Sequence, residues 1–391
     1  MGDLLFINQF SFRHCNQRGG RLAAYLPNPI TERDIQTMTT DPKQHAVREV
    51  EYYAPSFLDK FMNFIERLPV PYWLTYLLLF IAQSTVMHIL AWVDGWLPVF
   101  TSNPLIFLFP LWQWLPLAIM TYSRTVSRQA LSTFSPLLDA EENELKRLKY
   151  EFSTMPSRGV ILNGVVWGIV YVILTYATFD TFYVSYGLGM GTLLSVVLML
   201  EGLITYITGS AIYYYSFRQL SLVNRTVRMA KQFNLFRLGP VYAFSRVTSL
   251  IGISWMVMLS LTLLVFPIQL VSGLTLVILA LQVVLAVAAF VLPLWFVHLR
   301  LEDEKFRLLE ELNRQFELTS EKLHHCLENS DMGPVTQLKD AMLGLTAESE
   351  VLNGLPTWPW QTGVLTGFLS ATILPIVLFI SQLAIEKFLV K

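Results

Sequence analysis

Residues 274–298 have the sequence LTLVILALQVVLAVAAFVLPLWFVH, a run of 25 residues without Asp, Glu, Lys or Arg. A helix of about 20 apolar residues crosses the hydrocarbon core of a bilayer, so this stretch predicts a membrane-spanning helix. Residues 300–307, RLEDEKFR, follow almost directly, and their charge indicates that the chain has left the membrane. The whole chain is 53% hydrophobic and 15% charged, whereas an average soluble domain is roughly 25% charged. The sequence therefore predicts an integral membrane protein.

Six further stretches have the same apolar character, which predicts an all-α polytopic membrane protein with seven transmembrane helices. Residues 72–300 hold the first six spans and residues 361–391 the last. Pro110 and Pro116 remove backbone donors inside the second span, so we expect that helix to be kinked or broken. The seven predicted spans are Tyr72–Trp92, Pro104–Tyr122, Val160–Phe179, Leu188–Tyr213, Val247–Gln269, Leu274–His298 and Gly363–Leu383.

The 28 Lys and Arg residues are sorted between these spans. Eight precede the first span, and six lie in each of three segments: between spans two and three, four and five, and six and seven. Only Lys387 and Lys391 remain, at the C-terminus. Because basic residues accumulate in cytoplasmic loops, this pattern predicts a cytosolic N-terminus and a C-terminus outside. No short apolar region follows a basic start, as in a cleaved signal, which favours the plasma (inner) membrane of a prokaryote.

The segments assigned to the cytosol predict a helical layer beneath the membrane. Residues 1–71 form an N-terminal segment, residues 123–159 a helical hairpin and residues 214–246 a basic loop. Residues 301–360 predict two amphipathic helices, because apolar side chains recur there at three- and four-residue spacing. Such a stripe either packs within the chain or joins subunits, and both interpretations stay open. The first of these helices carries Phe306, Leu309, Leu312 and Phe316 on its apolar face.

One acidic residue, Glu201, falls near the middle of a predicted span. A charge at that depth costs several kcal/mol, so we expect the carboxyl group to be protonated, partnered or facing water. Its candidate partners are His88, Asn163 and Tyr206. Two interpretations are open: an ion or proton site, or a protonated glutamic acid that joins helices by hydrogen bonds.

The last predicted span carries polar residues that predict one face tolerant of water, as a pore-lining helix requires. Asp94 and Asp180 lie at the predicted outer ends of spans, where a ring of acids in an oligomer would attract cations. Turn residues beside helix ends are the simpler interpretation of the two aspartates. The candidates for the pore or ion pathway in the last span are Thr366, Ser370, Thr372, Ser381 and Gln382.

Residues 355–360, Leu-Pro-Thr-Trp-Pro-Trp, stand directly before the last span. Pro356 and Pro359 end the preceding helix and fix the angle at which the chain enters the membrane. Trp358 and Trp360 are expected at the inner membrane interface. The simpler interpretation is structural, and the other is a stiff elbow that couples the cytosolic helices to the last span.

Three stretches together resemble a family of uncharacterised prokaryotic seven-span membrane proteins: residues 236–246, residues 302–305 and the Pro-Thr-Trp-Pro-Trp of residues 356–360. This resemblance implies no activity. The topology also resembles the insect chemoreceptor (odorant and gustatory receptor) ion channels, which implies a homotetramer with the last span around a central pore. The last-span motif of those channels, Thr-Tyr, five apolar residues and Gln-Phe, aligns with Pro375-Ile376 and Gln382-Leu383, and only Gln382 agrees.

These features predict a homo-oligomeric ion channel in which the last span lines the pore. Two alternatives from other classes remain: a membrane-anchored signalling or scaffold protein that acts through its cytosolic helices, and a transporter with Glu201 as coupling acid. The sequence has no nucleotide-binding loop, no His-Glu-x-x-His and no nucleophile elbow, so we expect no catalytic residue, no cofactor and no metal. The expected partners are membrane lipids, further copies of the chain and an unidentified small-molecule ligand, and nothing indicates nucleic acid.

Overall fold

The structure, a computed structural model, describes residues 52–138, 140–179, 192–230, 235–236, 238–265, 273–329 and 332–389. Within these ranges the regular elements are helices, as predicted. Seven of the helices there are long and apolar enough to cross a membrane, which confirms a multi-pass membrane protein. Asp180, one of the two predicted outer aspartates, lies outside the described residues.

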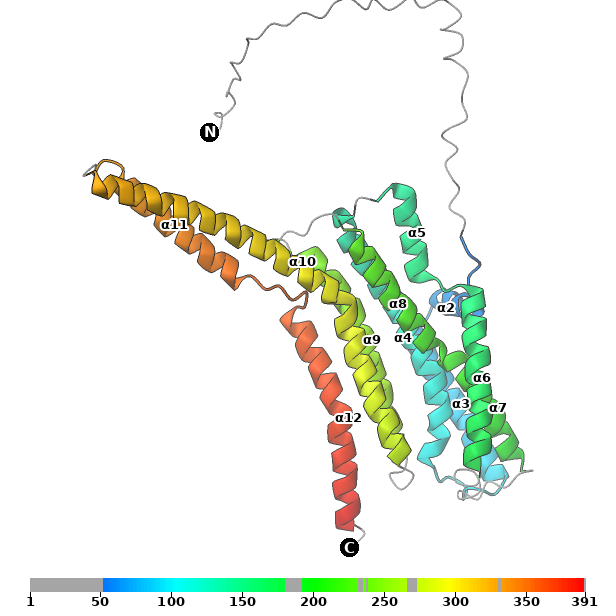
Figure 1. Cartoon of the computed structure of the whole chain (residues 1–391). Helices are drawn as coiled ribbons and strands as arrows, with labels where there is room; N and C mark the ends of the chain where they lie inside the picture. The colour runs from blue at the N-terminus through cyan, green and yellow to red at the C-terminus, as the bar shows by residue number, and fades with distance from the viewer. Residues whose placement is uncertain are drawn as a thin grey trace, which may run out of the picture. The chain divides into compact units, whose positions relative to one another are not determined.

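The predicted spans correspond to helices that begin or end within a few residues of the expected positions, except where a helix continues beyond the membrane. The spans are formed by α3 (Tyr72–Val93), α4 (Leu108–Phe134), α6 (Ser157–Phe179), α7 (Leu193–Gly209), α9 (Gly239–Val265), α10 (Gly273–Glu328) and α12 (Thr362–Leu389) (Figure 1).

The second span is a continuous helix, so of the two expected effects of its prolines, a kink or a break, the break does not occur. A short turn of 3-10 helix, η1 (Pro104–Phe107), leads into α4. Pro110 lies in the first turn of α4, where a backbone N–H has no intrahelical partner to lose. Pro116 lies inside the helix and frees the carbonyl of Trp112. The end of α7 packs over that carbonyl, and a Cβ on Gly209 would lie only 2.1 Å from its oxygen. Only glycine permits this approach.

Residues 214–246 are mostly helical, so the prediction of a basic loop was wrong. α8 (Ala211–Arg228) follows α7 after the single residue Ser210, and α9 begins at Gly239. Leu222, Val223 and Val227 are buried at helical spacing along α8. The prediction of a loop rested on the three arginines of α8. The apolar residues between them recur at helical spacing, which gives an amphipathic helix with one buried face.

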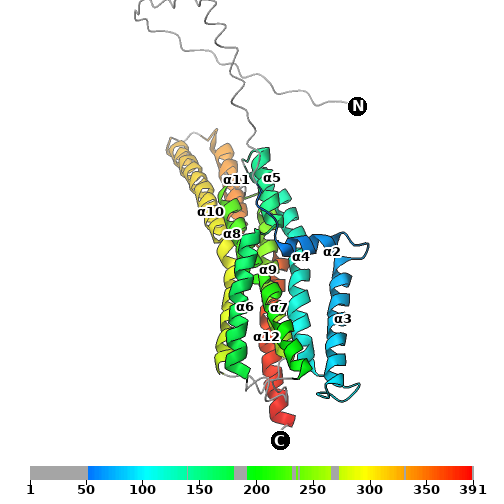
Figure 2. The ribbon, with the colours of Figure 1, turned by 90° about the vertical axis from the view of Figure 1, so that its right-hand side faces the viewer.

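A short helix, α2 (Phe57–Glu66), runs crosswise to α3 and was missing from the sequence prediction (Figure 2). Its first turn is fixed by a capping box. The hydroxyl of Ser56 accepts a hydrogen bond from the amide of Asp59 at 3.1 Å, and the Asp59 carboxylate accepts one from the amide of Ser56 at 3.1 Å. This spacing of a serine and an acid is a known helix start, so the sequence did contain the signal.

Asp59 also ties α2 to the segments around it. Its carboxylate lies 3.4 Å from the guanidinium of Arg124 on α4, with the two side chains 1% and 3% exposed. It also accepts a hydrogen bond at 2.8 Å from the amide of Met155, in the connection between α5 (Glu142–Ser153) and α6. The N-terminal segment therefore contacts the hairpin that the basic residues assigned to the same side of the membrane.

Tyr53 joins the same layer to α8. Its hydroxyl accepts a hydrogen bond from Arg218 at 2.6 Å and donates one to the carbonyl of Thr154 at 2.6 Å. Burial raises the pKa of the Tyr53 phenol well above its ordinary value, and the Arg218 charge opposes that rise only in part. The phenol is therefore a neutral, fixed link between the N-terminal segment and α8.

α9 is the central helix of the C-terminal half. It packs against α4, α10 and α12 and supplies much of the largest buried cluster, including Phe244, Val247 and Met256. The predicted spans differ widely in burial, from 67% of the apolar window in α9 to 11% in α12. The last helix therefore packs chiefly on α9 and leaves most of its surface uncovered.

α10 continues past the membrane as one long helix, as predicted, and α11 (Val335–Gly354) returns along it (Figure 1). Of the predicted apolar stripe on this part of α10, Leu312 is buried, but Phe306 is 69% exposed and Phe316 is also exposed. Packing within the chain therefore covers only part of the stripe.

Candidate functional site

The outward face of α12 carries three of the predicted pore residues. Thr366, Ser370 and Ser381 are all exposed. They are separated by four and eleven residues, which is close to one and three turns of helix, so they lie on one face. Phe368 and Pro375 are buried on the opposite side. The face with the hydroxyl groups thus points away from α9.

Gln382 and Thr372 lie on the other side of the helix, toward α9. The amide Nε2 of Gln382 donates a hydrogen bond of 2.7 Å to the carbonyl of Leu263 on α9. The hydroxyl of Thr372 donates to the carbonyl of Phe368 in its own helix at 2.9 Å. Both residues are half-buried. The structure therefore separates them from the exposed hydroxyl face, so three of the five residues share one face and two do not.

Phe368 fits against α9 because residue 252 is a glycine. A Cβ on Gly252 would lie 2.6 Å from Cε2 of Phe368 and 3.2 Å from the carbonyl oxygen of Ala286. The glycine therefore lets α9, α10 and α12 meet closely at one level, and it fixes which side of α12 is buried.

The predicted elbow is packed on α10 by a continuous series of rings. The imidazole of His298 stacks on Trp358 with ring centroids 3.7 Å apart and an interplanar angle of 6°. Trp358 stacks on Trp360 at 4.6 Å, and Trp360 on Phe290 at 4.9 Å. Phe290 stacks in turn on Phe368 of α12 at 4.2 Å. The rings connect the elbow, the end of the membrane part of α10 and the first turns of α12.

Two polar contacts hold the backbone of the elbow to α10. Nζ of Lys305 donates hydrogen bonds to the carbonyls of Asn353 at 2.8 Å and Leu355 at 2.9 Å, at the end of α11. Nδ1 of His298 lies 3.2 Å from the carbonyl of Thr357. A cation at a helix C-terminus satisfies carbonyls that have no intrahelical partner. Pro359 is buried and Pro356 is exposed, so the elbow has one packed and one open side.

Glu201, the intramembrane acid, belongs to a hydrogen-bonded cluster between α3, α4 and α7. Nε2 of Gln83 donates to Oε1 of Glu201 at 2.7 Å and to Oε1 of Gln113 at 3.0 Å. The hydroxyl of Thr205 donates to the same Gln113 oxygen at 3.4 Å. The indole N–H of Trp114 donates to Oε1 of Gln83. Glu201 is 7% exposed, and its Oε2 has no hydrogen-bond partner among the described residues.

The expected partners of Glu201 bond elsewhere, so that expectation was wrong. The ring nitrogens of His88 lie 2.7 Å from the carbonyl of Ser84 and 2.9 Å from the hydroxyl of Ser102. Asn163 donates to the hydroxyl of Ser210 at 3.1 Å. The ring of Tyr206 packs against Trp167 and Tyr171.

The depth of each residue in the membrane explains why Gln83, and not His88, bonds to Glu201. Helices advance 1.5 Å per residue, and Glu201 lies eight residues from the start of α7. Gln83 lies ten residues from the end of α3, at a similar level, whereas His88 lies only five residues from that end. A comparison of the depths of polar residues in the predicted spans would have identified Gln83 as a partner of Glu201.

A cavity of about 250 Å³ lies beside this cluster, among α4, α6, α7, α8 and α9. Thr205 is shared between the cavity wall and the cluster. Five aromatic side chains line most of the cavity, two of them tyrosines, and three serine or threonine residues add further hydroxyl groups. The rings belong to Phe109, Trp112, Trp167, Tyr206 and Tyr213, and the hydroxyls to Thr205, Ser210 and Thr262.

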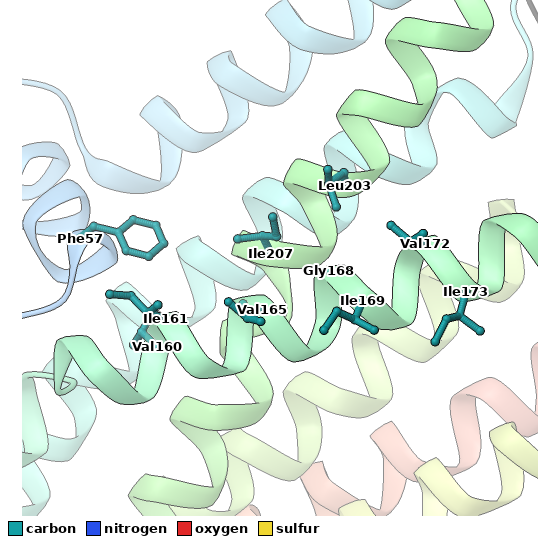
Figure 3. Close-up of a pocket in the computed structure, with 11 residues that line it drawn as sticks. Phe57, Val160, Ile161, Val165, Gly168, Ile169, Val172, Ile173, Leu203 and Ile207 are labelled. Atoms are coloured by element: carbon teal, nitrogen blue, oxygen red, sulfur yellow. The ribbon is translucent and has the colours of Figure 1, made fainter.

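A second hollow, a groove of about 500 Å³, runs along the outer surfaces of α6 and α7 (Figure 3). Phe57 of α2 closes one end, and branched aliphatic side chains such as Ile161, Ile169 and Ile207 line the rest. The lining is almost purely hydrocarbon, which fits contact with lipid chains and offers no group for catalysis or ion binding.

Asp94 is exposed and forms the C-terminal cap of α3, where its amide bonds to the carbonyl of Leu90 at 2.9 Å. It is a turn residue by geometry.

No family model, curated protein or solved structure matches the chain. The two resemblances noted from the sequence therefore rest on its residues and its topology.

Proposed function

We propose that the protein is a homo-oligomeric ion channel in which α12 lines the pore. The observation that carries the proposal is the uncovered face of α12, with Thr366, Ser370 and Ser381 in line on the least buried of the spans. A helix surrounded by lipid uses hydroxyl groups only for bonds to its own backbone, as Thr366 bonds to the carbonyl of Thr362 at 2.8 Å. A pore-lining helix can also use aligned hydroxyl groups to replace the water around an ion. The resemblance to the chemoreceptor channels implies that the oligomer has four copies of the chain.

The pore face also contains a constriction in this proposal. Leu374 and Val377 lie between Ser370 and Ser381 on the same side of α12, at four- and three-residue steps, and both are exposed. Apolar rings of this kind close channels by excluding water. The hydroxyl groups on either side of the two residues would hold ions, and the apolar level between them would be the gate.

The elbow and the long helices give the proposed channel a means of control. The stack from His298 to Phe368 joins the base of α12 to α10, so movement of the cytosolic helices would move the pore helix. The exposed Phe306 on α10 is a suitable contact for a second copy. The topology belongs to the same proposal: the distribution of basic residues supports a cytosolic N-terminus in a plasma (inner) membrane.

Cysteine accessibility tests the pore assignment. Ser370→Cys is made in the full chain with Cys15 and Cys326 replaced by serine, and its matched control is Leu369→Cys, an exposed neighbour on the flank of α12. In planar bilayers, a charged water-soluble thiol reagent is expected to block the current of the first variant and leave that of the control unchanged. Absence of current, or equal insensitivity of both variants, would contradict the proposal.

A transporter coupled to Glu201 is the second candidate. It is favoured by the chain of hydrogen bonds that runs from Glu201 through Gln83 and Gln113 to Thr205 at the wall of the 250 Å³ cavity. An acid buried near a cavity within one copy of the chain is a typical coupling group. A scaffold that acts through the exposed part of the α10 stripe is the remaining alternative.

A further inference from the structure

A groove of about 360 Å³ lies between α8 and α10, with the buried ring of Trp255 beneath it. One side is a stripe on α8 that contains Phe217, Leu220 and Asn224, and the other is a stripe on α10 that contains Leu285 and Leu292. Most of these side chains are half-buried or exposed, although each lies next to the packed core. The groove therefore presents a continuous apolar surface on the membrane side of the molecule.

Two arginines stand at one end of this groove. Arg228, one turn beyond Asn224, donates a hydrogen bond to the Asn224 side chain at 3.1 Å, and its guanidinium lies 5.1 Å from the centre of the Phe296 ring. Arg300, one turn beyond Phe296, lies 5.0 Å from the same ring and donates to the carbonyl of Ala230 at 3.2 Å. The two guanidinium groups are thus held at one phenylalanine, at the polar ends of the two stripes.

Neither arginine has an acidic partner among the described residues. Within the described residues, neither forms an ion pair, whereas Arg225 on the same helix pairs with Glu151 at 3.4 Å. A guanidinium carries five N–H donors, and the hydrogen bonds described above use one on each. Most of the donors of the pair are therefore free to bind an anion at the inner end of the predicted membrane layer.

We propose that the groove between α8 and α10 is a binding site for an anionic phospholipid, with the acyl chain on Trp255 and the phosphate between Arg228 and Arg300. Arginine binds phosphate oxygens through two parallel hydrogen bonds, and basic pockets between membrane helices are a recurring type of headgroup site. The acyl chain follows from the position of the groove, since one of its sides, with Leu285 and Leu292, belongs to the membrane-spanning part of α10. The proposal does not depend on the channel function.

The groove on α6 and α7 provides a useful contrast. It is larger and its lining residues are all apolar, and among the described residues no arginine is held at its end by contacts like those at Phe296. It should accept any acyl chain without regard to the headgroup. Selectivity for an anionic headgroup is therefore the property that separates the proposed site from ordinary lipid contact.

Native mass spectrometry of the full chain, extracted from vesicles of equal parts phosphatidylglycerol and phosphatidylcholine with identical acyl chains, tests the site. The wild-type protein is expected to retain phosphatidylglycerol preferentially. In the double variant Arg228→Gln with Arg300→Gln, that preference should fall roughly tenfold or more, since each removes a basic contact to the headgroup. The matched control is Arg158→Gln with Arg246→Gln, two exposed arginines near the predicted inner ends of α6 and α9.

A second pair of variants tests the acyl chain. Ala288→Trp fills the groove, whereas Val287→Trp places the same ring on the neighbouring, exposed position of α10, which does not line it. Retained phosphatidylglycerol should fall in the first variant only. Equal retention in both would show that the arginines bind a phosphate without its chain and would overturn the proposal. Equal loss of preference in the two double arginine variants would overturn it as well, because the effect would then be general surface charge.

Discussion

At the scale of single residues, Glu201 is the position that most needs stabilising contacts, because it is an acid buried in a predicted span. Its carboxyl group is buried between three helices, and Gln83 donates its nearest hydrogen bond at 2.7 Å. A glutamine can both donate and accept, so Gln83 links Glu201 to Gln113 and the side chains form one network. The network explains how an acid is held between the helices, and within the described residues it leaves Oε2 of Glu201 without a hydrogen-bond partner.

Substitution at this network separates the channel from the transporter. Glu201→Gln keeps a group that can accept from Gln83, so we expect stability to change by less than about 1 kcal/mol, the usual scale of such bonds in membranes. Gln83→Leu leaves a buried carboxyl without its donor and should destabilise the protein by roughly 1–3 kcal/mol. Thermal unfolding in detergent measures both.

The functional outcome of Glu201→Gln then discriminates between the two proposals. In the channel, ion current should persist because the pore face lies on α12. Complete loss of current, or loss of pH-driven uptake in vesicles, would instead assign the function to Glu201.

At the scale of elements, the decisive piece is the elbow between α11 and α12. Two prolines end one helix before the next begins, and a lone irregular segment of this kind would hinge freely. Here the stack of Trp358 and Trp360 on His298 and Phe290, together with the Lys305 contacts, holds it to α10. The prolines supply the turn, and packing on α10 supplies its stiffness.

Removal of the Lys305 ammonium should loosen the elbow. In Lys305→Met the carbonyls of Asn353 and Leu355 lose their donor, and we expect faster amide hydrogen exchange across residues 353–365. Lys322→Met is the matched control, because Lys322 is an exposed lysine further along the same helix. Unchanged exchange in Lys305→Met would mean that the aromatic stack alone fixes the elbow.

At the scale of the whole molecule, the uneven burial of the helices is the main feature. α9 is enclosed by neighbours, whereas α12 contacts chiefly α9. Thr366, Ser370 and Ser381 lie on its open side. A polar-tolerant face next to lipid gains from association with further copies, in which hydroxyl groups meet water or one another.

The mass of the full chain in mild detergent tests this association. We expect a closed oligomer, with four copies as the favoured number. Phe306→Gln should reduce the oligomeric fraction, because it weakens the exposed apolar contact of α10. A wild-type protein that is entirely monomeric would contradict both the subunit contact and the pore.

Much of the fold was predictable because hydropathy acts locally. Runs of apolar residues identified the seven spans, and the spacing of Phe306 and Leu312 identified the helical continuation of α10. The errors came from features that depend on neighbours. Pro116 lies inside an unbroken α4, where Gly209 packs over the freed carbonyl. The apolar face of α8, mistaken for part of a loop, packs chiefly on α10, α6 and α4.

The sequence by itself determined which stretches form helices apolar enough to cross a membrane, since a span must satisfy its own backbone in a solvent without water. It also determined the candidate residues Glu201 and Ser370 by their rarity in apolar surroundings. Only the tertiary structure decided their partners. The rotation and depth of the packed helices place Gln83 next to Glu201 and direct Gln382 toward α9. They also leave Ser370 on the open face of α12. Arg228 and Arg300 contact the same phenylalanine ring for the same reason. Side-chain contacts between helices depend on how each helix is rotated and how deep it lies, and the composition of a single span determines neither.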